Sequence, residues 1–346
     1  MLFRSLLQAA VFGALVALAA HALVDYDLQV LCGFLICCAL ASLALSPSSG
    51  AVSGKIKTPS RIVLGAGLLA LLGVSYMQLV VEQELQLGLL AVAEGNNREA
   101  EVHYAKAARA SFHNAEAELG LGEALVGQAV ASGNESTFNR AKVPFQKAAQ
   151  YSPQNPKYAF RQARYFLMKR DTEHALEALT RTLELDPHYI KAYLVKAQVL
   201  RQLGRESEAT ALWQQVLALE QTAFGTIRPL EFGKETGYAS AAYFLGRQAL
   251  AEGNLAEARS LLARGQSVVE DNRSMPAHIL ESLEFAGNWT EADSRQLTAV
   301  EGLLVLLESD LLQAEGRQGQ AVPKRKKGEE LLALLGVNLE EAERLL

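Results

Sequence analysis

Small residues at a regular spacing constrain the fold of this chain more than any other feature of its sequence. Pairs of Gly or Ala recur with 12 positions between their members: Gly88 and Ala100, Ala163 and Ala175, Ala197 and Ala209, and Gly246 and Ala258. Ala163 and Ala197 are 34 positions apart, as are Pro153 and Pro187. Two antiparallel helices cross closely only where each carries a small residue, and proline cannot continue a helix. The pattern therefore predicts antiparallel helix pairs repeated along the chain.

Bulky residues and turn glycines complete each predicted pair. A bulky residue stands four positions after the second small residue, as Tyr104, Leu179, Trp213 and Leu262, and as Phe145 after Ala141. Gly95, Gly204 and Gly253 can supply the left-handed backbone that a turn between two helices requires. The combination resembles the tetratricopeptide repeat family. That resemblance implies an all-α solenoid whose concave groove is lined by the first helix of each repeat and binds protein partners.

The predicted repeats cover residues 82–272 and leave an irregular C-terminal part. They lie at about 81–114, 115–155, 156–189, 190–223 and 239–272, with an irregular loop at 224–238. The second repeat is longer around residues 127–137, which predicts a lengthened helix pair. Residues 273–346 are predicted to form degenerate helical repeats and capping helices, at 275–286, 291–314 and 329–346. Terminal repeats of a solenoid are commonly atypical because they cap the stack.

The first 81 residues have the composition of a membrane segment. Apolar runs cover residues 5–24, 28–45 and 62–81, and each is long enough to cross a bilayer as a helix. We therefore predict three transmembrane helices. Lys55, Lys57 and Arg61 lie between the second and third runs, which places residues 82 onward outside the cytoplasm. Alternatively, the first run is a cleaved signal peptide, because Arg4 precedes it.

The link between the first two runs carries a short motif. His21, Asp25 and Asp27, followed by a second apolar run, resemble a segment near the end of the membrane part of bacterial O-antigen ligase/polymerase proteins. The resemblance covers about residues 5–45 and implies work on lipid-linked glycans at the outer face of a bacterial inner membrane. The many other spans of that family, and the loop with its essential basic residues, are missing from this sequence. In an alternative interpretation, His21 and Asp25 are a helix i, i+4 pair that stabilises the hairpin.

No catalytic or metal-binding motif emerges from the sequence. Cys32, Cys37 and Cys38 all fall in the second apolar run, where cysteine is expected to pack as a small apolar residue. No His-Glu-x-x-His pair and no phosphate-binding glycine loop occur. We predict no cofactor, no metal and no enzymatic activity. Residues 82–346 contain 29 Lys+Arg and 36 Asp+Glu, and this acidic balance excludes general nucleic-acid binding.

A partner-binding groove is predicted in the third and fourth repeats. By repeat register, the residues expected to face it are Lys157, Phe160, Arg164, Lys191, Leu194, Gln198 and Arg201. Such a positive strip over an apolar floor suits an acidic peptide tail or an anionic glycan. In the alternative interpretation, these cations lie on a solvated helix face and pair with nearby acids. The run at residues 324–327 is expected to be a solvated turn.

These observations lead to one functional prediction and two alternatives. We predict a multi-pass protein of the bacterial inner membrane that serves as an interaction scaffold in cell-envelope polysaccharide assembly. Its repeats lie on the extracytoplasmic side, and a multi-span glycan ligase or polymerase is a possible partner. One alternative is the C-terminal half of a split or truncated ligase/polymerase. The other is a membrane-tethered adaptor of a different assembly pathway.

Overall fold

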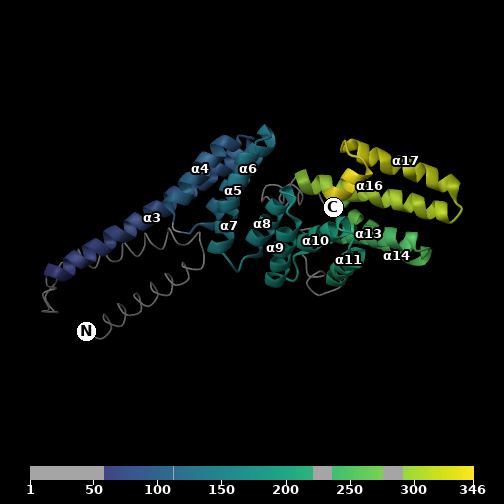
Figure 1. Ribbon diagram of the computed structural model, residues 1–346, viewed down its shortest axis with the longest axis horizontal. Coiled ribbons are helices and arrows are strands. Elements are labelled where there is room, and N and C mark those ends of the chain that lie inside the picture. The colour runs from purple at the N-terminus through teal and green to yellow at the C-terminus, as the bar shows by residue number, and fades with distance from the viewer. Residues whose placement is uncertain (1–57, 112, 221–235, 276–290) are drawn as a thin grey trace, which may run out of the picture. The chain divides into compact units, whose positions relative to one another are not determined.

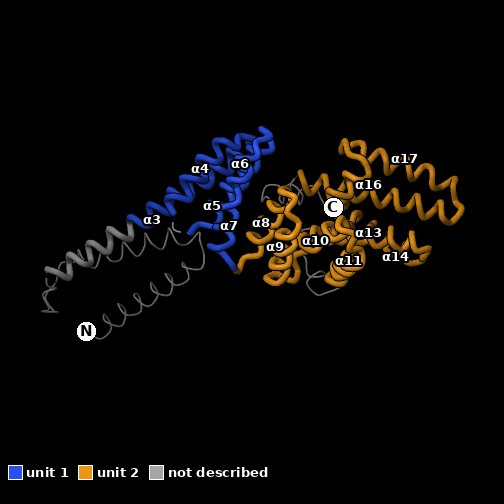
Figure 2. Tube along the Cα trace, in the orientation of Figure 1, with its two compact units in different colours: residues 1–153 blue, residues 154–346 orange. Residues whose placement is uncertain are grey.

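The described part of the chain is helical throughout. The computed structural model describes residues 58–111, 113–220, 236–275 and 291–346, with side chains described from residue 73 onward. These residues form helices and the turns between them, with no strand among them (Figure 1). This confirms the predicted all-α class. Contacts divide the chain into two compact units, residues 1–153 and 154–346 (Figure 2).

The first unit is organised around the ring of Tyr104. Its helices are α3 (Thr58–Ala93), α4 (Asn97–Ala110), α5 (Ala115–Ser132), α6 (Glu135–Arg140) and α7 (Lys142–Tyr151). Helix α4 packs against both α3 and α5. A Cβ added to Gly88 of α3 would lie 2.8 Å from the Tyr104 ring, and one added to Gly120 of α5 would lie 2.5 Å away. The bulky residue of the repeat pattern thus fills the space that two glycines leave.

The extra length of the second repeat is divided between two helices. Helix α5 runs to Ser132, and Gly133 ends it in the left-handed conformation at φ 65°. The short helix α6 follows, and α7 packs back against α5.

The second unit consists of helix pairs followed by a short final helix. Its helices are α8 (Pro156–Met168), α9 (Thr172–Leu185), α10 (Ile190–Gln202), α11 (Glu206–Glu220), α13 (Gly237–Ala251), α14 (Leu255–Arg273), α16 (Glu291–Ala314), α17 (Gln318–Leu334) and α18 (Leu339–Leu345). The pairs α8–α9, α10–α11, α13–α14 and α16–α17 pack against each other (Figure 1). The predicted loop at 224–238 lies largely outside the described residues, but Gly237 and Tyr238 already belong to α13.

The crossing residues lie where the pattern placed them. Ala197 and Ala209 are fully buried between α10 and α11. A Cβ added to Gly246 would lie 2.8 Å from Leu307 and 3.9 Å from the carbonyl oxygen of Ala258. Helices α13 and α14 therefore approach closely at Gly246 and Ala258, as predicted from their 12-residue spacing.

Asparagine or aspartate side chains begin half of the described helices. A side-chain oxygen accepts a backbone N–H of the first turn at Asn96, Asn114, Asn134, Asn155, Asp171, Asn254 and Asn338. Each of these bonds satisfies a donor that has no partner within its helix. Five of these caps directly follow a residue in the left-handed conformation, namely Gly95, His113, Gly133, Arg170 or Gly253, so the turn and the start of the next helix are defined together.

Two predictions about the C-terminal part are wrong. Residues 324–327 are not a turn but lie within α17, where Lys324 pairs with Glu308 at 2.8 Å and Arg325 pairs with Asp310. The run is helical because α17 packs along α16, whose acidic side chains neutralise its cations. Residues 329–346 are not one helix, since α17 ends at Leu334 and Gly336 has φ 67° before α18 begins.

The predicted membrane spans are not supported by the described residues. Among these residues, no helix combines the length and apolar composition needed to cross a bilayer. Helix α3 contains the third apolar run and continues to Ala93 as the first helix of the first repeat. The first two runs, together with His21, Asp25 and Asp27, lie outside the described residues. The predicted helix at 275–286 also lies outside them, except for Met275.

Candidate functional site

A buried carboxylate marks the candidate site. Glu343 lies on α18 and is 8% exposed. It faces α10 and α13, the first helices of two consecutive repeats, which pack against each other. Helix α18 also packs on α16. Helix α18 therefore packs on the first helices of two repeats, which are the helices that the sequence analysis expects to line a partner-binding groove.

Four side chains from α10 and α13 converge on Glu343. The Gln198 Nε2 donates to the Glu343 backbone carbonyl at 3.1 Å, and both terminal nitrogens of Arg201 donate to Oε2 at 3.1 Å. The Tyr243 hydroxyl donates to Oε1 at 2.8 Å, and Arg247 Nη1 donates to the same oxygen. Charge-assisted bonds of this kind are stronger than neutral ones. The site therefore recognises both the side chain and the main chain of one residue.

The protonation states at this site favour carboxylate binding. Burial, and secondarily the negative charge of Glu343, raise the pKa of Tyr243 well above its ordinary value, so its hydroxyl remains a donor. Burial opposes the charge of Arg247, but the attraction of Tyr243 and Glu343 outweighs burial and raises the pKa of Arg247. Two guanidinium groups therefore face one carboxylate.

Aromatic packing holds Arg201 in position. Its guanidinium carbon lies 4.7 Å from the centroid of the Phe244 ring, a cation–π distance. Phe244 in turn stacks on the buried Trp213, with ring centroids 4.7 Å apart and an interplanar angle of 13°. Trp213 is the bulky residue of the fourth repeat. The core of one repeat thus positions a cation in the groove.

Only a small apolar contact supplements the polar contacts of α18. Ala342 and Leu346 belong to the same hydrophobic core as Leu200 and Tyr243. Gln296 of α16 donates to the carbonyl of Leu346 at 3.4 Å. The remaining side chains of residues 339–346 are exposed. Helix α18 is therefore attached to the groove along one edge.

The structure brings only part of the predicted groove set together. Gln198 and Arg201 meet at Glu343, whereas Lys191 pairs with Asp293 of α16 at 3.7 Å. The residues expected to form the apolar floor are packed into cores, with Phe160 6% and Leu194 2% exposed. The two other predicted residues lie on α8, where Lys157 is positioned 5.8 Å from the Tyr158 ring and Arg164 is exposed.

The sequence analysis missed Tyr243, Arg247 and Glu343. Two of them follow from the repeat register: aligning Ala197 with Gly246, a shift of 49 positions, places Tyr243 at the position of Leu194 and Arg247 at that of Gln198. The predicted set of groove residues could therefore have been extended to the repeat that follows the irregular loop. Nothing in the sequence singles out Glu343 among the acids of the last helix.

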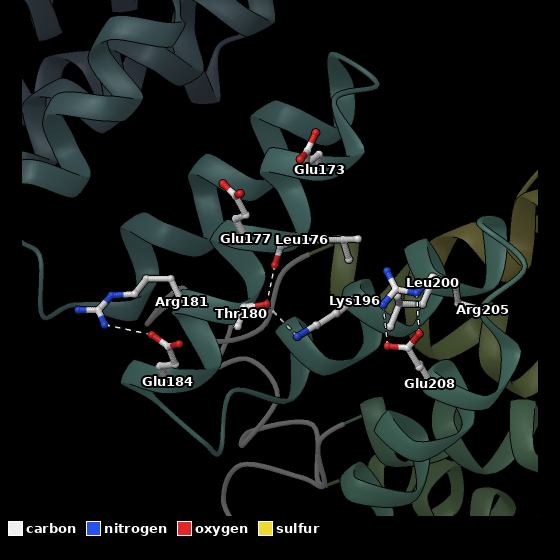
Figure 3. Close-up of a pocket in the computed structure, with 10 residues that line it drawn as sticks. All are labelled: Glu173, Leu176, Glu177, Thr180, Arg181, Glu184, Lys196, Leu200, Arg205 and Glu208. Atoms are coloured by element: carbon white, nitrogen blue, oxygen red, sulfur yellow. Dashed lines mark hydrogen bonds and ion pairs between the residues drawn. The ribbon is translucent and has the colours of Figure 1, made fainter.

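A second, open groove lies between α9, α10 and α11 (Figure 3). Its volume is about 530 Å³, and it is lined by Glu173, Leu176, Glu177, Thr180, Arg181, Glu184, Lys196, Leu200, Arg205 and Glu208. The Lys196 ammonium donates to the Thr180 hydroxyl at 2.9 Å. Burial, together with the charge of Arg205, lowers the pKa of Lys196. Similar space recurs between α11, α13 and α14, where Leu245 takes the place of Lys196.

No metal centre is found in the part of the chain that the structure describes. No cluster of three or more His, Cys, Asp or Glu side chains is placed there to hold an ion.

Comparisons with known proteins give structural similarities only. No family model matches the chain, and no curated protein matches it in sequence. Among solved structures, pilF of Pseudomonas aeruginosa shares 16% identity over 76% of this chain and 96% of its own, with a TM-score of 0.49. PilW, a widely conserved type IV pilus biogenesis factor, shares 18% over 76% and 97%, with a TM-score of 0.45. YrrB, a TPR protein with an unusual peptide-binding site, shares 19% over 54% and 84%, with a TM-score of 0.37. At this level of similarity, none of the three assigns a function to this chain.

Proposed function

We propose that this protein is a membrane-anchored interaction scaffold whose groove binds an acidic helical segment of a protein partner. One observation carries this proposal: Gln198, Arg201, Tyr243 and Arg247 all donate to a single glutamate of a helix. These donors are held on rigid, packed helices. Binding a partner there would require little ordering of the receptor, which favours affinity.

Membrane anchoring is supported by composition and by the exposed surface of α3. Three apolar runs precede residue 82. In the part of α3 whose side chains are described, Val74 is 58% exposed, Tyr76 65% and Leu79 54%. These side chains belong to the third run, and a bilayer would cover them. The distribution of Lys and Arg supports repeats on the extracytoplasmic side of a bacterial inner membrane.

A role in cell-envelope polysaccharide assembly rests on the motif at His21, Asp25 and Asp27. Under this proposal, the partner is a multi-span glycan ligase or polymerase, and the membrane helices bring the groove to it. The split-enzyme alternative makes a different prediction. In that case, replacing His21 with Ala would abolish glycan transfer by the assembled complex, whereas a scaffold would retain it.

Site-specific photo-crosslinking tests the groove as the partner-binding surface. A photoreactive residue is placed at Gln198 in the full chain, and a matched variant carries it at Val322 of α17, which is 69% exposed. In native membranes, we expect position 198 to yield an adduct that maps to an acidic helical segment of another protein and disappears when Arg201→Ala and Arg247→Ala are combined. Equal yields of the same adduct at position 322 would contradict the proposal.

Cysteine labelling tests the membrane topology. The native Cys32, Cys37 and Cys38 are replaced by serine, and Val322→Cys supplies a single exposed thiol. In spheroplasts, a membrane-impermeant maleimide should label this cysteine without lysis. The labelled protein should also remain in the membrane fraction after alkaline extraction. Labelling only after lysis would place the repeats in the cytoplasm, and release by alkali would argue against spanning helices.

A further inference from the structure

We infer that α18 is a resident ligand of the groove, so that a partner must displace the chain's own C-terminal helix to bind. This inference rests on the proposed function and names the class of ligand for the same site. The groove recognises a helical segment that carries a glutamate, with a small apolar residue just before it and a large apolar residue three positions after it. In this chain these residues are Ala342 and Glu343 of α18 and Leu346, which follows the helix.

The groove also binds the main chain of the glutamate. Gln198 Nε2 donates to the backbone carbonyl of Glu343 at 3.1 Å. The residue is therefore held through its backbone as well as through its carboxylate, and this contact favours a helix whose backbone lies close to α10.

The attachment of α18 is suited to exchange. Only Ala342, Glu343 and Leu346 of residues 339–346 are buried. A short turn through Gly336 joins α18 to α17, so the helix can leave while the α16–α17 pair keeps its own packing.

Charge also favours a competing ligand. Arg201 and Arg247 both bind Glu343, so two guanidinium groups are neutralised by one carboxylate. A partner helix that brings a second acid to this point would satisfy the remaining positive charge. Helix α18 itself carries Glu340 and Glu341, but both are exposed. The partner is therefore expected to be a more acidic version of α18.

Peptide binding in trans tests this inference. The probe is a fluorescein-labelled synthetic peptide with the sequence of residues 337–346, and its anisotropy is measured with the purified full chain in detergent. Glu343→Gln removes the carboxylate that binds α18 to the groove, but it leaves Arg201 and Arg247 in place. Glu340→Gln is the matched control, since it removes the same charge from a side chain that is 75% exposed.

We expect Glu343→Gln to bind the probe at least ten-fold more tightly than the wild type, and Glu340→Gln to bind like the wild type. A chain ending at Asn338 lacks α18 and should bind the probe as tightly as Glu343→Gln. This variant controls for the case in which α18 with glutamine at position 343 still occupies the groove. Adding Arg201→Gln and Arg247→Gln together to Glu343→Gln should abolish binding, because both guanidinium partners of the carboxylate are then missing, and a probe with Gln at position 343 should not bind either. Circular dichroism confirms that each variant is folded.

The outcomes distinguish occupancy of the groove by α18 from the proposal that the groove binds an acidic helix. Equal, tight binding by the wild type and by Glu343→Gln would overturn self-occupancy and leave the groove as an open receptor. Absence of binding by every folded variant would overturn the ligand class. In that case, the photo-crosslinking at Gln198 still decides independently whether the groove contacts a partner.

Discussion

The guanidinium of Arg247 on α13 hydrogen-bonds the carboxylate of Glu343 on α18, 96 residues further along the chain. Arg201 of α10 binds the other carboxylate oxygen. The two arginines differ in burial, because the side chain of Arg201 is 27% exposed and that of Arg247 is 48% exposed. The more exposed pair is weakened more by solvent. Replacing Arg201 or Arg247 by alanine should therefore lower the free energy of unfolding by different amounts.

Arg201→Ala is expected to destabilise the second unit by about 2 kcal/mol, and Arg247→Ala by about 1 kcal/mol. Arg201 loses two hydrogen bonds and its packing on Phe244, whereas Arg247 leaves Glu343 still bound by Arg201 and Tyr243. Denaturant unfolding followed by Trp213 fluorescence, in a Trp289→Phe background, measures both values. Equal losses would mean that burial does not control these bonds.

Two glycines of α17 should respond to alanine in opposite directions. A Cβ at Gly328 would lie 2.7 Å from Leu306 and 3.0 Å from the backbone carbonyl of Gly302, and the backbone cannot move aside without separating α16 from α17. Gly328→Ala should cost about 1–3 kcal/mol through overpacking. Gly319 has no neighbour within 4 Å, so Gly319→Ala should stabilise by about 0.5–1 kcal/mol. Thermal unfolding of the pair provides the measurement, and a loss of stability in both would contradict the packing argument.

The turns of the third and fourth repeats carry different residues at the same left-handed position. Arg170 and Gly204 are 34 positions apart and occupy the same turn, with φ of 59° and 73°. A side chain in the left-handed region costs roughly 1–2 kcal/mol. Gly204→Ala should therefore destabilise by about that amount, whereas Arg170→Gly should stabilise by up to about 1 kcal/mol after the extra entropy of glycine in the unfolded chain is subtracted. Melting temperatures that shift in the same direction would refute this.

The pKa of His174 should lie above the ordinary value for histidine. The hydrogen bond that His174 Nδ1 donates to Asp171, whose carboxylate oxygens both lie 2.9 Å away, is the largest cause of the raised pKa of His174, and the charge of Asp171 adds to it. Because the pKa is raised in the folded state, this pair stabilises the fold fully below the unfolded value near 6.5 and loses its effect as pH rises through the folded value. An NMR titration of the imidazole measures the shift. Asp171→Asn should bring the pKa back toward 6.5, and an unchanged value would exclude Asp171 as the cause.

Lys196 should lose its proton at lower pH than an ordinary lysine. Burial is the largest cause of its lowered pKa, and Arg205 adds to it (Figure 3). Competitive acetylation at several pH values, with a short lysine peptide as reference, reports the apparent pKa. Arg205→Gln should raise the value, both by removing a positive charge and by freeing Glu208 from its ion pair. A value that falls in this variant would contradict the electrostatic explanation.

Local features of the fold were predictable because they depend on neighbours in sequence. The close approach at Gly246 and Ala258 involves two helices joined by a three-residue turn, so a 12-residue spacing is enough to identify it. The glycine turn at Gly253 follows from the same local geometry. The charged run at residues 324–327 was predicted to be a solvated turn, but it lies within α17. Its helical state depends on acids of α16 that only the folded structure brings near.

The sequence by itself determined that this chain forms helix pairs with close crossings, because small residues and turn residues act within a single repeat. It also indicated half of the groove, since Gln198 and Arg201 follow from repeat register. Only the tertiary structure decided what fills that groove. Glu343 is one of several acids on a short amphipathic helix, and its burial depends on Arg201 and Arg247 from helices 142 and 96 residues earlier. Such a contact requires the chain to return across its own repeats, and no local periodicity encodes that return.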